Sequence, residues 1–168
     1  IACANDAIQQ EAARNAEYQH MGTALVCAVA RSDMAIIGNI GDSRAYHITP
    51  EGIFQISRDH SVVENMVAKG DLTPLEARTH PNRNLITRAL GPDIHAKADT
   101  FELPWHKDEF LLLCSDGLVN TVTDQEMLFE VLHDGDVNEC LDHLLQISLQ
   151  RGAPDNITAV LLLNEEGR

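Results

Sequence analysis

Short runs of apolar residues with turn residues between them fill positions 23–57. Their composition is typical of strands, and the polar or Pro/Gly turns that separate them are only a few residues long. Connections this short join antiparallel neighbours, because a parallel pair needs a crossover of a dozen or more residues. We therefore predict an antiparallel meander. Its strands are TALVCAVA (23–30), MAIIGNI (34–40), SRAYHIT (43–49) and GIFQIS (52–57).

Apolar residues at helical spacing precede this strand-rich stretch. They recur every three or four positions, with polar residues between them, which is the pattern of an amphipathic helix. We predict a helix over residues 1–19 whose small-residue face packs closely on a sheet. The apolar positions are Ile1, Ala4, Ile8, Ala12 and Ala16.

Capping signals predict the helices that follow the meander. A Ser or Thr with Glu three residues later satisfies two main-chain N–H groups that a helix start leaves without partners. This spacing begins at Ser61, Thr73 and Thr123, and Asp136 is a weaker start of the same kind. The expected helices are two short ones between 61 and 79, the first ended by Gly70, and two longer ones over about 123–133 and 137–151.

Three further strands are predicted near 98–103, 109–115 and 157–163. With strands grouped before helices, a regular βαβ order is excluded. The pattern therefore predicts an α+β fold in which antiparallel sheet is covered by helices. The length of 168 residues fits a single domain.

The charge balance is strongly acidic. Acidic residues outnumber basic ones by 26 to 12, which gives a net charge of −14. Because no cluster of Lys or Arg interrupts this balance, nucleic acid and anionic membranes are not expected partners. A surplus of carboxylates suits divalent cations, although a solubilised surface accounts equally well for most of the acidic residues.

The cysteines indicate a reducing compartment. Four are present without any C-x-x-C pair, and three of them lie inside apolar segments. Buried thiols are therefore expected in place of disulfides or a zinc site. No apolar run reaches the length of a membrane span and no signal-peptide pattern opens the chain, so we expect no membrane insertion and a cytoplasmic location.

Three aspartates share one sequence context, the end of an apolar strand beside a small or amide residue. Asp42 follows MAIIGNIG, Asp116 follows FLLLCS, and Asp155 comes just before ITAVLLL. If these strand ends meet at one rim, the three carboxylates need a cation to stay ionised together. Hard divalent ions with oxygen ligands, Mg²⁺ or Mn²⁺, meet that need. Each aspartate alone is typical of a turn, so only the combination indicates a metal site.

Six short motifs spread over nearly the whole chain, from Ile1 to Leu163, carry a family resemblance. They are MGTALV, IGNIGDSRAY, SRDHS, HPNRNLITRALG, LLLCSDGL and GAPDNIT. In order and approximate spacing they resemble the metal-dependent protein phosphatases of type 2C, especially the compact bacterial members. Each motif alone is weak, but six in register are specific. The resemblance implies a sandwich of two antiparallel β-sheets flanked by helices (αββα), with a two-metal centre in a cleft at one end.

The resemblance also implies roles for individual residues. Asp116 and Asp155 match ligands of a core metal ion, and Asp42 matches an aspartate that helps to hold a third, more labile ion. The helical segment at about 61–82 matches a flap beside the active site that influences substrate choice. Residues that match supporting positions around the ligands and the flap are Ser43, His60, Gly117 and Asn156.

The implied reaction is hydrolysis of phosphoserine and phosphothreonine in proteins. Two Mn²⁺ or Mg²⁺ ions lower the pKa of a bridging water, align it behind phosphorus and offset charge on the phosphoryl oxygens. No protein nucleophile is then required, so none of the residues is assigned a direct catalytic role. Phosphoproteins are the implied substrates, and a cognate protein kinase system is an expected partner in signalling.

The chain departs from the family pattern in one respect. We find no match to the aspartate of the first strands, the arginine that grips the phosphate, the Asp-Gly that bridges both metals, or the histidine proposed as proton donor. Residues 1–168 are therefore expected to be the C-terminal portion of one type 2C catalytic domain, incomplete at the N-terminus. We expect a phosphatase in the intact parent protein, and little activity and weak Mn²⁺ binding in this chain alone.

Three other functions fit the sequence less well. A pseudophosphatase, that is, a regulatory or binding module with the same fold, is favoured by the missing motifs and disfavoured by retention of the three aspartates. A phosphoaspartyl-type hydrolase is disfavoured because Leu118 stands where that chemistry needs its second aspartate. Zinc hydrolysis is disfavoured because the eight histidines form no H-x-x-x-H or H-E-x-x-H pair.

Overall fold

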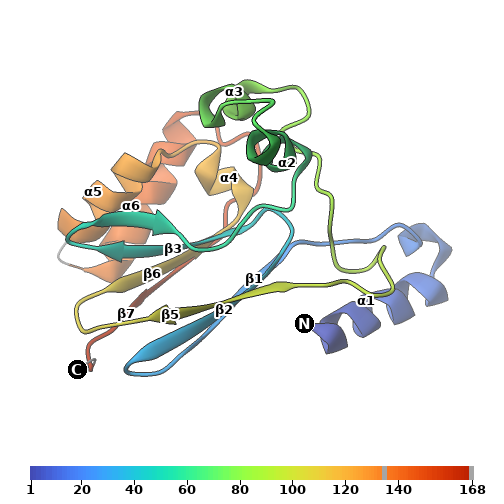
Figure 1. The fold of residues 1–168 in the computed structure, drawn as a ribbon, viewed down its shortest axis with the longest axis horizontal. Coiled ribbons are helices and arrows are strands. Elements are labelled where there is room, and N and C mark those ends of the chain that lie inside the picture. The colour runs from blue at the N-terminus through green and yellow to red at the C-terminus, as the bar shows by residue number, and fades with distance from the viewer. Residues whose placement is uncertain (134–135, 167–168) are drawn as a thin grey trace. The chain divides into compact units, whose positions relative to one another are not determined.

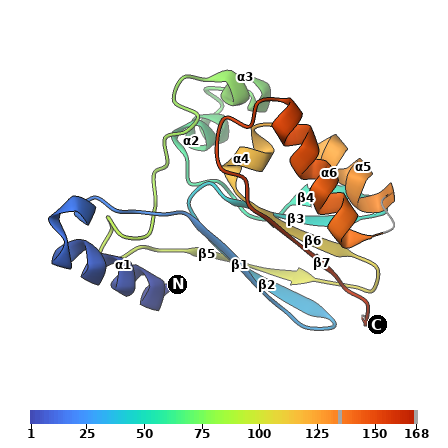
Figure 2. The same cartoon turned by 180° about the vertical axis from the view of Figure 1, so that it is seen from behind.

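The computed structural model describes residues 1–133 and 136–166 (Figures 1 and 2). The chain divides into two compact units, each built from three segments. The first unit comprises Ile1–Val26, Gly38–Ser43 and Arg58–Thr100, and the second comprises Cys27–Ile37, Arg44–Ser57 and Phe101–Arg168.

The fold is α+β, with two antiparallel sheets and flanking helices, as predicted. A three-stranded sheet has the order β1-β2-β5, and a four-stranded sheet has the order β4-β3-β6-β7. The strands are β1 (Leu25–Ala30), β2 (Met34–Ile40), β3 (Arg44–Thr49), β4 (Gly52–Gln55), β5 (Asp99–Pro104), β6 (Phe110–Cys114) and β7 (Ala159–Leu163).

The predicted meander is only partly correct, because β2 and β3 lie in different sheets. The chain leaves the first sheet at residues 41–43, where Gly41 has a φ of 105°. A Cβ added to Gly41 would lie 2.4 Å from the Cβ of Ala24, so glycine is required both for the conformation and for the space. A tight turn between sheets thus replaces the second hairpin of the prediction, and Asp42 is part of it.

The main core belongs to the second unit. Helices α5 (Asp124–His133) and α6 (Val137–Gln150) cover one face of the four-stranded sheet (Figure 2). Strand β6 is central, pairing with β3 through Tyr46 opposite Leu112 and with β7 through Cys114 opposite Ala159. Burial of these apolar side chains supplies the main driving force for this unit. The largest buried side chains of the cluster include Tyr46, Ile48, Leu112, Leu118, Met127 and Leu144.

The predicted helix starts are confirmed. At Thr73, the side chain accepts from the N–H of Glu76 at 3.3 Å, while the Glu76 carboxylate accepts from the N–H of Thr73 at 2.8 Å. Thr123 and Glu126 make the same reciprocal pair, and Ser61 accepts from the N–H of Glu64 at 3.1 Å. The first two helices are α2 (Val62–Lys69), ended by Gly70 with a φ of 81°, and α3 (Pro74–Thr79).

The first helix is shorter than predicted and is held by polar residues. Helix α1 (Ala2–Arg14) ends where Asn15 becomes extended, with its side chain accepting from the N–H of Glu17 at 3.0 Å. The predicted small-residue face is largely exposed, so that part of the prediction is wrong. Instead, the buried Asn5 side chain accepts from the N–H of Gly91 at 2.7 Å and donates to the carbonyl of Asp93 at 3.0 Å.

An ion pair between Arg151 and Glu126 connects α6 to α5 in the second unit. The Arg151 guanidinium, just beyond α6, donates to the Glu126 carboxylate at the start of α5 and to the carbonyl of Thr121, at 2.8 and 2.7 Å. Hydrogen bonds from Arg151, and next from Thr123, lower the pKa of Glu126 from an ordinary 4.5 to about 2. Arg151 therefore connects the turn after α6 to residues 121–126 at the start of α5.

Replacing Glu126 by Gln should reduce stability in a pH-dependent way. Because both side chains of the pair are partly exposed, we expect a loss of about 1 kcal/mol at pH 7. The lowered carboxyl pKa means that this contribution is complete above pH 4.5 and disappears as the pH falls toward about 2. Urea unfolding of both proteins across that range measures it. The control, Glu11→Gln, removes the exposed Arg14–Glu11 pair at 3.7 Å and should cost little at any pH.

In the described part of the chain, no helix is both long and apolar enough to cross a bilayer. Cys114 and Cys140 are buried in the second unit, as expected for core thiols, whereas Cys3 is exposed.

Candidate metal centre

Asp116 stands at the end of the central strand β6. The strand stops at Cys114, Ser115 follows in an extended conformation, and Asp116 begins a short helix, α4 (Asp116–Val119), that the sequence pattern did not predict. The Asp116 side chain is half-buried, and its Oδ2 lies 3.5 Å from the Nδ2 of Asn120. The burial of β6 thus carries a carboxylate to the rim of the sheet.

Asp155 lies in the turn that connects α6 to β7. Gly152 and Ala153 have positive φ values of 92° and 31°, which reverse the chain direction after the helix. The Asp155 side chain is exposed, and its Oδ1 accepts from the N–H of Asn156 at 2.7 Å. This local hydrogen bond fixes one carboxylate oxygen over the turn.

Ser115 ties the two aspartate turns together. Its N–H donates to the carbonyl of Thr158 at 2.9 Å, and its Oγ accepts from the N–H of Thr158 at 3.0 Å. The same hydroxyl donates to the carbonyl of Asn156 at 3.3 Å. These contacts continue the β6–β7 pairing by one step beyond Cys114 and Ala159. Asp116 and Asp155, two of the three aspartates that were predicted to come together, therefore lie in adjoining turns at the same end of the second sheet.

Gly117 permits the close approach of these turns. A Cβ added there would lie 2.3 Å from the carbonyl oxygen of Asn156, closer than any real contact. Because the obstacle is main chain, it cannot swing aside as a flexible side chain would. The small residue beside Asp116 and the carbonyl of Asn156 thus set the distance between the two turns, which is consistent with the supporting roles expected of Gly117 and Asn156.

The donor chemistry of the pair fits a hard divalent cation. Carboxylate oxygens are the ligands that Mg²⁺ and Mn²⁺ prefer, and two carboxylates in adjoining turns repel each other without a cation. Within residues 1–133 and 136–166, no group of three or more His, Cys, Asp or Glu side chains is arranged to hold a metal ion. Asp116 and Asp155 are thus two candidate ligands, and the described residues add no third side chain of these types to them.

The remaining predicted site residues belong to the first unit. Asp42 and Ser43 occupy the half-buried turn after β2, and His60 lies in the segment before α2. The His60 imidazole is buried and bonds to the main chain of Gly41, next to Asp42. The described contacts thus associate Asp116 with Asp155 in one unit, and the Asp42 turn with His60 in the other.

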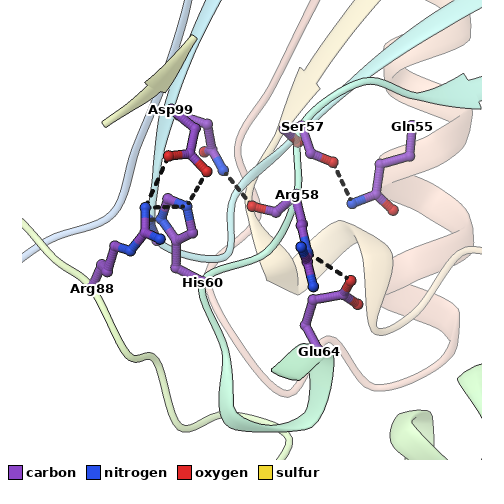
Figure 3. Close-up of polar contacts among 9 residues, drawn as sticks. Gln55, Ser57, Arg58, His60, Glu64, Arg88 and Asp99 are labelled. Atoms are coloured by element: carbon purple, nitrogen blue, oxygen red, sulfur yellow. Dashed lines mark hydrogen bonds and ion pairs between the residues drawn. The ribbon is translucent and has the colours of Figure 1, made fainter. Parts of the chain in front are cut away.

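Two charged residues beside His60 were missed at the level of sequence. Figure 3 shows the side chains of His60 and Arg88 directed at the carboxylate of Asp99, with distances of 3.0 and 2.9 Å. The hydrogen bond from His60 is the largest influence on the pKa of Asp99, and with help from Arg88 it outweighs partial burial and lowers that pKa. Aspartate is uncommon in strands, so its position as the first residue of β5 was the one feature of the sequence that could have identified Asp99 as a functional candidate.

Comparison with known proteins identifies the family of this arrangement. The family model described as Protein phosphatase 2C matches residues 2–161. The serine/threonine phosphatase stp of Listeria monocytogenes is 36% identical over 151 residues, which cover 88% of this chain and 60% of that protein. The serine/threonine protein phosphatase PstP of Mycobacterium tuberculosis is 34% identical over 162 residues, covering 96% of this chain and 31% of the relative.

Solved structures agree in fold. Serine/threonine phosphatase Stp1 from Staphylococcus aureus superimposes with a TM-score of 0.90 at 41% identity, covering 95% of this chain and 63% of that one. The catalytic domain of PstP in complex with two manganese ions gives a TM-score of 0.83 at 32% identity, covering 94% and 65%. The chain spans about 60% of the length of the Listeria relative that it matches.

Proposed function

Since the chain belongs to the protein phosphatase 2C family, we propose that its protein is a metal-dependent serine/threonine phosphatase that hydrolyses phosphoproteins. The observation that carries the proposal is the pair of aspartates at the ends of β6 and β7, joined by Ser115. Proteins commonly hold Mg²⁺ through one or two carboxylates, with waters and substrate phosphate as the other ligands, and this pair suits that role.

In this proposal Asp116 and Asp155 ligate a core Mn²⁺ or Mg²⁺ ion, and Asp42 ligates a third ion. When bound, the ions supply a water of lowered pKa and offset negative charge on the phosphoryl group. The chain itself contributes the oxygen donors and their spacing: Ser115 and Gly117 hold the two turns together, so both carboxylates keep fixed positions. Donors beyond these two complete the centre, because the described residues assemble no larger ligand group.

The substrates we propose are proteins that carry phosphoserine or phosphothreonine, made by a cognate kinase in the cytoplasm. The names of the relatives support a phosphatase and do not favour a pseudophosphatase module. Residues 61–82, which hold α2 and α3, serve in this proposal as the flap beside the substrate (Figure 1). Leu75 is the large apolar side chain that these residues expose.

Hydrolysis of a phosphothreonine peptide tests the proposal. The protein at its full encoded length should release phosphate with Mn²⁺ present and stop when EDTA removes the ion, whereas residues 1–168 alone should show little turnover. Phosphate release that is unaffected by EDTA would contradict the metal mechanism. Equal turnover by the two lengths would contradict the view that further donors are needed, and peptide binding without turnover would favour the pseudophosphatase.

A further inference from the structure

The turn that carries Asp42 is fastened to the segment before α2. The N–H of Gly41 donates to the Nδ1 of His60 at 3.2 Å, and the N–H of His60 donates back to the carbonyl of Gly41 at 2.8 Å. Two residues earlier, the Asn39 side chain donates to the carbonyl of Arg58 at 3.0 Å. Three hydrogen bonds thus join residues 39–41 to residues 58–60, immediately before the aspartate.

These contacts select the tautomer of the neutral His60 ring. A main-chain N–H can only donate, so Nδ1 of the ring must accept and a neutral ring carries its proton on Nε2. That atom faces Asp99 Oδ2 at 3.0 Å, and the carboxylate accepts the proton's hydrogen bond. A carboxylate in this position selects the tautomer that Gly41 requires. The ring is 5% exposed, so water does not compete for either nitrogen.

Arg88 completes the arrangement from another part of the chain. Its Nη1 donates to Asp99 Oδ1 at 2.9 Å and lies 3.2 Å from the Nε2 of His60, so the carboxylate accepts from both neighbours (Figure 3). Residues 85–87, just before Arg88, are hydrogen-bonded to the start of α2. The N–H of Thr87 donates to the carbonyl of His60 at 2.6 Å, and the N–H of Val62 donates to the carbonyl of Leu85 at 2.9 Å. The chain just before the segment 61–82 and the chain just after it, at residues 85–88, therefore meet at His60.

We propose that His60, Asp99 and Arg88 form a positioning relay that fixes the Gly41–Asp42 turn and links it to the chain on both sides of the segment 61–82. Glycine is the most permissive residue, so the φ of 105° at Gly41 depends on restraint by its neighbours, and the two hydrogen bonds to His60 supply that restraint. Constraint of Gly41 orients the next residue, Asp42. The consequence for metal binding rests on the proposed function, whereas the constraint on Gly41 does not.

The relay is tested by Asp99→Asn. Asparagine keeps the size of the side chain but has one acceptor oxygen, whereas the carboxylate uses two, one for His60 and one for Arg88. We expect the amide of Gly41 to exchange with solvent roughly tenfold faster, the effect of losing about one hydrogen bond. In the protein at its full encoded length, the Mn²⁺ concentration for half-maximal activity should rise about tenfold, as for other residues that support ligands. The side-chain ¹⁵N shifts of His60 should move from the Nε2–H form toward a mixture.

A matched control is Glu11→Gln, which removes the exposed Arg14–Glu11 ion pair at 3.7 Å in the same unit and lies outside the segment 61–82. Both readouts should stay at their original values in this variant. A second test variant, Arg88→Lys, keeps the charge and should give a smaller shift than Arg88→Ala, even if Asp99→Asn proves too unstable to study. The relay is refuted if Asp99→Asn and Arg88→Ala leave Gly41 exchange at the level of the control. A protein without Mn²⁺-dependent turnover would refute the proposed function instead, and Gly41 exchange would still decide the relay.

Discussion

Replacing Asp116 by Asn is expected to lower Mn²⁺-dependent phosphatase activity of the full-length protein by at least about 100-fold, the upper range for residues that only support a ligand. Asn keeps the shape and its carbonyl oxygen but loses the negative charge that a hard cation requires. The fold should persist, since Asp116 is only half-buried at the rim. Initial rates at saturating Mn²⁺, with melting temperatures measured in EDTA, separate the loss of ligand from the loss of structure.

The matched control for Asp116→Asn is Asp108→Asn. Asp108 lies between β5 and β6 with a φ of 63°, a conformation that asparagine adopts readily. This variant should keep nearly full activity, which shows that removing a carboxylate as such is harmless. If Asp116→Asn retained the activity of Asp108→Asn, Asp116 would not be a metal ligand.

Replacing Gly117 by Ala should damage structure and activity together. The new Cβ would meet the carbonyl oxygen of Asn156 at 2.3 Å, so the turn that carries Asp155 must move away from Asp116. Overpacking of this kind costs about 1–3 kcal/mol of stability. A displacement of about 1 Å in a catalytic arrangement can cost about 100-fold in rate, and we expect a loss of that size. Urea unfolding and initial rates measure the two effects.

Gly52→Ala separates the clash from a general effect of replacing glycine. Gly52 begins β4, far along the chain from either aspartate, and a Cβ there meets the Phe54 ring at an ordinary 3.6 Å. Its φ of 153° makes alanine unfavourable, so some stability should be lost while the rate per folded molecule is kept. A Gly117→Ala protein with normal turnover would show that the spacing of the two turns is not critical.

Local sequence pattern was sufficient for most of the secondary structure and for placing two of the three candidate aspartates beside neighbouring strands. Capping at Thr73 and Thr123 depends on residues three positions apart, so it is legible in the sequence. Asp42, Asp116 and Asp155 were predicted to meet because each adjoins an apolar strand, and the described contacts join the turns of Asp116 and Asp155. The structure shows the strands beside these two turns, β6 and β7, to be paired neighbours.

The features that were missed depend on contacts between distant parts of the chain. Which sheet β3 joins is decided by pairing with β6, more than 60 residues later, and not by the turn after β2. Asp99 and Arg88 acquire a role only through the buried ring of His60. Similarly, the sequence pattern did not single out Asn5, and its burial follows from hydrogen bonds to residues 91–93.

Paramagnetic line broadening by Mn²⁺ in the isotopically labelled protein tests most directly whether one divalent ion lies between the turns of Asp116 and Asp155. We predict that amide signals of residues 115–117 and 155–157 broaden together at the lowest Mn²⁺ concentrations, and that Asp116→Asn abolishes broadening at both turns. Broadening confined to one turn, or broadening near residue 155 that persists in Asp116→Asn, would contradict a shared ion.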